Sequence, residues 1–125
     1  MYLLDVSSKT WKVLDCPGIG ARTYHSASLI CGNKLVVLGG VKYEDFTPVK
    51  RYDLSTINLI TLDFEKCTGQ VQIFKIKVDK PINVSYHGSI ALDKFFCVYG
   101  GYYNVGSDIR KPSQSSNLYL IDTSD

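Results

Sequence analysis

Two stretches of the chain repeat each other: RTYHSASLICGNKLVVLGG at residues 22–40 and VSYHGSIALDKFFCVYGG at residues 84–101. The Tyr-His pairs at 24–25 and 86–87 align at an offset of 62 residues, and the Gly-Gly pairs at 39–40 and 100–101 align at 61. The one-residue difference falls in a polar turn, where a deletion is best tolerated. Both histidines of the chain occupy matching positions, so we interpret the two stretches as an internal repeat.

A second, shorter element also recurs. YLLDVSS at residues 2–8 matches YLIDTSD at residues 119–125, and RYDLST at 51–56 is a weaker copy between them. Each reads as a strand that runs into a turn of Asp, Ser and Thr, whose side chains can bond their own backbone. Trp11 follows the first copy six residues after Asp5, and Leu59 stands at the matching place after Asp53.

Nearly the whole chain is predicted to form strands. The segments are rich in β-branched and aromatic residues, are bounded by Gly, Asp, Asn or Pro, and show no helical stripe. Each repeat therefore contains about four strands with a tight hairpin, which is the build of a propeller blade. The predicted strands are Met1–Val6, Thr10–Leu14, Tyr24–Cys31, Lys34–Leu38, Val49–Leu54, Asn58–Phe64, Val71–Val78, Tyr86–Leu92, Phe95–Tyr99 and Asn117–Asp122.

Composition narrows the class of protein. The 125 residues are enough for one domain, and 45% hydrophobic with 21% charged residues is typical of a globular protein. No apolar run approaches the length of a membrane helix, and a net charge of +2 is too weak to indicate nucleic-acid binding. The four cysteines form no C-x-x-C pair, so we expect neither a metal site nor a disulfide scaffold, and a cytoplasmic or nuclear location.

At these residues the chain resembles the kelch repeat family. The resemblance rests on the two Tyr-His strand starts, the two Gly-Gly pairs after apolar strands, and the Tyr-x-x-Asp…Trp pattern of residues 2–11. It implies four-stranded blades with the His-containing strand innermost, then the strand ending in Gly-Gly, the Tyr-x-x-Asp strand, and the Trp strand outermost. The residues expected to serve structure rather than chemistry are Trp11, His25, Gly39, Gly40, His87, Gly100 and Gly101.

This register divides residues 1–125 into a partial kelch propeller. Residues 1–16 would end one blade, 22–79 would form one full blade, and 84–125 would supply the first three strands of another. The outermost strand of the full blade could be Asn58–Phe64 or Val71–Val78; we favour the second, with the first as an extension of strand three. About two to two and a half blades leave an incomplete ring. Either the chain belongs to a longer protein, or copies of it complete the ring by self-association.

Binding residues are expected in the segments after the Gly-Gly pairs, because surface loops and aromatic or Arg anchors are common in interfaces. Ser26 follows His25 on one strand, so the two side chains point to opposite faces and form no nucleophile–base pair. We therefore expect no enzyme, no cofactor and no metal. The candidate partner-binding residues are Tyr43, Glu44, Tyr102, Tyr103, Arg110 and Lys111.

The sequence thus favours a protein–protein interaction module. Its partner would be another protein rather than a nucleic acid or a membrane, and family resemblance alone does not identify it. The alternative is a fragment of a longer kelch protein with no activity of its own.

Overall fold

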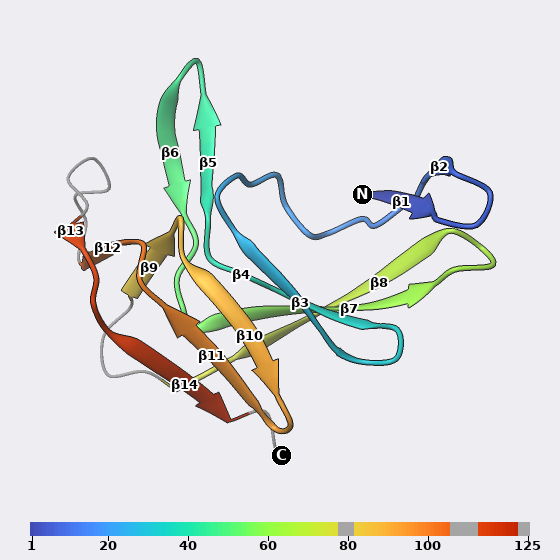
Figure 1. Ribbon diagram of the computed structural model, residues 1–125. Helices are drawn as coiled ribbons and strands as arrows, with labels where there is room; N and C mark the ends of the chain where they lie inside the picture. Colours follow the sequence, from blue (N-terminus) through green and yellow to red (C-terminus); the bar gives the residue numbers. More distant parts are fainter. Residues whose placement is uncertain (78–81, 106–112, 123–125) are drawn as a thin grey trace.

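A computed structural model describes residues 1–77, 82–105 and 113–122 (Figure 1). Within these residues every regular element is a β-strand, and the strands form small antiparallel sheets, none of which closes into a barrel. The predicted all-β class is therefore confirmed, and the sheets have the size expected of incomplete blades.

The largest sheet lies in the middle of the chain and is called the central sheet here. Its strands are β3 (Ser26–Cys31), β4 (Lys34–Leu38), β7 (Thr56–Asp63) and β8 (Thr68–Lys75), hydrogen-bonded in that order. Gly32, at φ 46°, forms the tight turn between β3 and β4. The favoured prediction for the outermost strand is confirmed, because β8 includes most of Val71–Val78 and lies at the edge of the sheet.

The third strand of the central sheet differs from the prediction. β4 pairs with β7, which includes most of the predicted extension Asn58–Phe64, and not with the predicted strand Val49–Leu54 itself. The turn after β7 repeats the turn after Tyr2–Asp5: Asp63 faces Thr68 as Asp5 faces Thr10, and each aspartate accepts hydrogen bonds from the amides two and three residues later. Because this turn sets the register, the counterpart of Trp11 is Gly69 rather than Leu59.

A second blade-like sheet follows and is called the C-terminal sheet. It consists of β10 (Gly88–Leu92), β11 (Phe95–Tyr99) and β14 (Leu118–Asp122), in the order β10-β11-β14. Figure 1 shows it crossing beside the central sheet, with β10 next to β3. Its three strands thus have the same order as β3, β4 and β7 of the central sheet.

The chain begins with a two-stranded sheet, the N-terminal hairpin, made of β1 (Tyr2–Asp5) and β2 (Thr10–Val13). The side chain of Trp11, which is expected to serve structure, is 67% exposed and belongs to neither apolar cluster of the described residues. The physical reason is that β1 and β2 pair only with each other among the described strands, so no sheet covers the face that contains Trp11.

The described residues that follow the Gly-Gly pairs form strands where loops are expected. β5 (Val41–Glu44) and β6 (Thr47–Arg51) form a projecting hairpin, whose turn places Asp45 and Phe46 at positive φ. β12 (Tyr102–Val105) pairs with β9 (Ile82–Ser85) and β13 (Ser113–Gln114). Both segments gain the backbone hydrogen bonds that a loop would have to take from water.

The core lies on the two faces of the central sheet. Alternate side chains on β4 point to opposite sides: Val36 and Leu38 pack against Phe96 and Val98 of the C-terminal sheet. On the other side, Val37 packs with Ile60, Leu62 and Leu14, which follows the N-terminal hairpin. Each fully buried side chain of this size contributes roughly 1.5–3 kcal/mol to folding.

Candidate binding surface

Four tyrosines from four separate segments gather into one group, called the tyrosine cluster here. Tyr24 and Tyr86, which precede β3 and β10, stack with ring centroids 3.8 Å apart and planes 18° apart. Tyr43 of β5 packs edge-on against Tyr24 at 6.2 Å, and Tyr102 of β12 packs edge-on against Tyr86 at 5.8 Å. The cluster joins two blades and the strands that follow each Gly-Gly pair.

The backbone of the stacked pair is strained. Tyr24 and Tyr86 have φ angles of 56° and 58°, in the left-handed region that costs an L-residue roughly 1–2 kcal/mol. The geometry is imposed by neighbouring backbone: the amide of Tyr86 donates to the carbonyl of Tyr24 at 3.0 Å. Strained residues of this kind concentrate at functional sites.

The four tyrosine rings of the cluster are partly exposed to solvent. Their exposed fractions lie between 38% for Tyr102 and 51% for Tyr86. Hydrogen bonding to Tyr24, followed by burial, raises the pKa of Tyr86 to about 12, so its hydroxyl stays protonated at neutral pH. The cluster therefore presents apolar ring faces together with hydroxyl donors, the combination that makes tyrosine common in interfaces.

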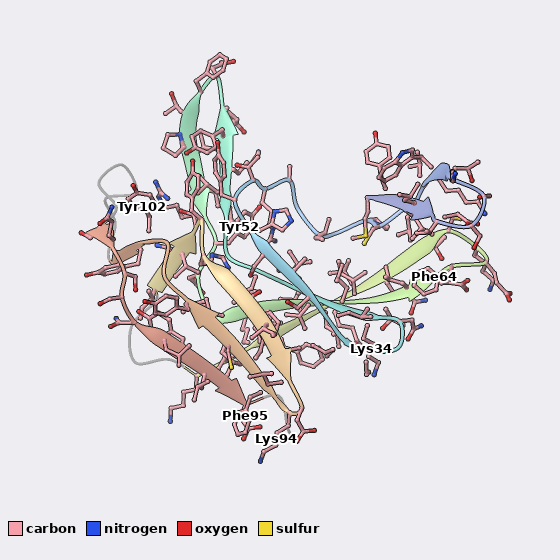
Figure 2. The ribbon with its side chains drawn as sticks, in the orientation of Figure 1. Lys34, Tyr52, Phe64, Lys94, Phe95 and Tyr102 are labelled. Carbon is pink, nitrogen blue, oxygen red and sulfur yellow. The ribbon has the colours of Figure 1, made fainter. Side chains whose placement is uncertain are left out.

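A basic cavity opens beside the β5–β6 hairpin. It has a volume of about 330 Å³ and is lined in part by Arg22, Lys50, Arg51, Tyr52 and Asp53. The guanidinium carbon of Arg22 lies 3.6 Å from the ring centre of Tyr52, and the Lys50 ammonium lies 4.8 Å from it. Figure 2 labels Tyr52 and Tyr102 on the two sides of the base of this hairpin.

Arg22 is fixed at the wall of this cavity. It donates to the carbonyls of Ile19 at 2.7 Å and Gly39 at 3.3 Å. With its amide oxygen turned toward the guanidinium, Asn58 also accepts from Arg22, at 3.2 and 3.3 Å. Three basic side chains against one Asp make the cavity electropositive.

The structure separates the candidate partner-binding residues. Tyr43 and Tyr102 meet in the tyrosine cluster, whereas Glu44 forms an exposed ion pair with Lys42 at 2.7 Å. Tyr103 is half-buried and packs against the core. Arg110 and Lys111 lie outside the described residues.

The contact between Ser26 and His87 is not predicted by the sequence analysis, which pairs Ser26 only with its neighbour His25. The Oγ of Ser26 and the Nε2 of His87 lie 2.7 Å apart, between two sheets. Burial, followed by the nearby charge of His25, lowers the pKa of His87 to about 4. The Nδ1 of His87 is buried without a hydrogen-bond partner in the described part of the chain. The repeat offset of 61–62 residues was the signal that could have predicted this pair.

The second glycine of each Gly-Gly pair lets the backbone pass close to the residue that precedes the Tyr-His pair of the same repeat. A Cβ on Gly40 would lie 2.7 Å from the carbonyl oxygen of Thr23, and a Cβ on Gly101 would collide with the carbonyl oxygen of Ser85. Both glycines have positive φ, so their conformation and their surroundings each favour glycine.

Among the described residues, His, Cys, Asp and Glu form no group of three or more that could hold a metal ion. The same residues contain no helix long and apolar enough to cross a membrane. The chain matches no family model and no curated protein sequence.

Proposed function

We propose that the chain is a kelch-type propeller segment that binds a protein partner through the tyrosine cluster. The observation that supports this most directly is the exposed stack of Tyr24 and Tyr86, held at a backbone geometry that folding alone does not favour. Edge-on contacts fix Tyr43 and Tyr102 around that stack, so little side-chain freedom is lost when a partner binds.

The proposed partner has an apolar segment that covers the rings and an acidic group that reaches the neighbouring cavity. Arg22, Lys50 and Arg51 outnumber Asp53 there, and both sites adjoin the β5–β6 hairpin. The role is binding rather than catalysis, in the cytoplasm. All four cysteines are free, which suits a reducing compartment.

The test compares three immobilised chains in a cytoplasmic extract: the unchanged chain, the double variant Tyr43→Ala/Tyr102→Ala, and the control Phe46→Ala. Phe46 is fully exposed at the tip of the same hairpin and outside the cluster. A captured protein is then purified and titrated against each chain. We expect the double variant to bind at least ~10-fold more weakly and the control to bind normally.

Equal binding to all three chains would remove the tyrosine cluster from the proposal. A chain that captures no saturable partner would instead favour the alternative, a fragment of a longer protein without independent activity.

A further inference from the structure

The contact between the central and C-terminal sheets joins two different faces, called the first face, on the central sheet, and the second face, on the C-terminal sheet. The central sheet contributes one face and the C-terminal sheet the other, and the faces meet in a single apolar cluster. On the central sheet the contact residues of β4 and β7 are Val36, Leu38, Ile57 and Leu59. On the C-terminal sheet the contact residues of β11 and β14 are Phe96, Val98, Tyr119 and Ile121.

The side of the C-terminal sheet that points away from the central sheet carries the counterpart of the first face. The 61-residue offset and the strand register make Cys97 and Tyr99 the counterparts of Val36 and Leu38, and Leu118 and Leu120 the counterparts of Ile57 and Leu59. In the central sheet this face is covered. In the C-terminal sheet it is open: Leu120 is 62% exposed, and Tyr99, Leu118 and Ile90 are also exposed.

Gly39 and Gly100 show the same difference between a covered face and an open face. A Cβ on Gly39 would lie 2.6 Å from the Cε1 of His87 and 2.6 Å from the carbonyl oxygen of Val84, both on the neighbouring blade. Its counterpart Gly100 has nothing within 4 Å, although it keeps a positive φ of 72°. Gly100 therefore keeps the backbone conformation of Gly39, but no neighbouring sheet of the described residues packs against it.

The N-terminal hairpin carries a counterpart of the second face, and this counterpart is exposed. The matching Asp5–Thr10 and Asp63–Thr68 turns place Tyr2 and Leu4 at the counterparts of Ile60 and Leu62. Ile60 is in turn the counterpart of Ile121, which makes the covering contact in the C-terminal sheet. Across the hairpin, Val13 pairs with Tyr2 and Trp11 with Leu4, and all four side chains are exposed.

We propose that two copies of this chain associate head to tail, the N-terminal hairpin of each covering the open face of the other's C-terminal sheet. The two faces belong to one chain and reproduce the two sides of a contact that the chain already makes internally. About two to two and a half blades from each copy give about four to five, within the range of about four to eight in which propellers close. The contact occurs twice about a two-fold axis, so the assembly is closed.

Light scattering of the full chain over a range of concentrations tests the proposal. A closed pair has a mass of 28 kDa, twice 14.0 kDa. The variants Trp11→Lys and Leu120→Lys each place a charge in one of the two faces, at side chains already exposed, and circular dichroism checks that the strands remain. Phe46→Lys adds the same charge at the hairpin tip and serves as the control.

We expect the unchanged chain and Phe46→Lys to form the pair, and each face variant to be monomeric alone. A mixture of the two face variants is the decisive sample, because the intact C-terminal sheet of Trp11→Lys can still receive the intact hairpin of Leu120→Lys. It should form a mixed pair that is weaker than the unchanged pair.

Three results would overturn the proposal. The first is a monomer at every concentration, which leaves the open faces for some other chain. The second is a pair that persists in Trp11→Lys, which would mean that C-terminal sheets meet each other. The third is a series of masses above the pair, which would mean open growth.

Discussion

The Nε2 of His87 lies 2.7 Å from the Oγ of Ser26, and this buried hydrogen bond joins β3 of the central sheet to the residue that precedes β10 of the C-terminal sheet. The residues are 61 positions apart in the sequence, which is the period of the repeat. The Nε2 of a neutral imidazole can accept a hydrogen bond from the Ser26 hydroxyl here, whereas protonated His87 would carry a charge in a buried position.

The stability of the fold should therefore fall in mild acid. Burial lowers the pKa of His87 from 6.5 to about 4, so the unfolded chain takes up a proton at a higher pH than the folded chain. Stability that is fully present above pH 6.5 is lost as the pH falls toward 4, by about 2–3 kcal/mol. Urea unfolding across this range should show a shallower decline for His87→Gln than for the unchanged chain. Parallel declines would mean that other groups cause the loss.

Gly39 and Gly100 form a matched pair for testing the contact between blades. Both have positive φ, so alanine costs each roughly 1–2 kcal/mol, but only at Gly39 would the new Cβ also strike His87 and Val84. In the Leu120→Lys background, which removes the proposed association, Gly39→Ala should lose at least about 2 kcal/mol more stability than Gly100→Ala. Chemical denaturation measures both, and equal losses would show that His87 and Val84 yield freely.

Tyr24→Asn should separate binding from folding. Asn tolerates the left-handed conformation, so the substitution relieves strain of roughly 1–2 kcal/mol. It also removes a stacked aromatic pair, which contributes roughly 0.5–1.5 kcal/mol. We expect the free energy of unfolding to change by less than about 1 kcal/mol while capture of the partner is lost. A variant that binds normally would show that the stack serves the fold alone.

The hydroxyl of Tyr86 should titrate late. Its pKa is raised to about 12, first by hydrogen bonding to Tyr24. The absorbance of the phenolate, followed with pH, should contain one component near that value. Tyr24→Phe keeps the ring and removes the hydroxyl, so the late component should move down toward the ordinary value of 10. The same titration of Tyr86→Phe identifies the component, which should then be absent.

The sequence was sufficient for the class of fold, because the β-branched and aromatic segments were bounded by turn residues that form the same turns in the structure. It was insufficient for the third strand of the central sheet. The RYDLST segment at residues 51–56 resembles the first copy, yet the β5–β6 hairpin ends at its first residue, Arg51, and β7 begins only at Thr56. Hydrogen bonding in the Asp63 turn, rather than the tyrosine, determines the register.

The candidate site was predictable in part. Tyr43 and Tyr102 are among the predicted partner-binding residues, whereas Tyr24 and Tyr86 enter the sequence analysis only as the starts of the two repeated strands. In the structure Tyr24 and Tyr86 have left-handed backbone angles, stack on each other and are partly exposed to solvent. Such a backbone angle at a tyrosine has no signature in the sequence. The basic cavity was missed for a similar reason, since it joins residues 22 and 50–53 through the fold.

The β5–β6 hairpin is the part of this chain most open to redesign. Among the described residues its two strands pair with each other and, beyond the bridge between Val41 and Thr23, with no other strand, and the side chain of Phe46 at the turn is fully exposed. Residues added at this turn would lengthen the hairpin without entering either apolar cluster. A peptide tag or a fluorescent label grafted there would report on the neighbouring tyrosines, and natural variation in loop length would be accommodated at the same place.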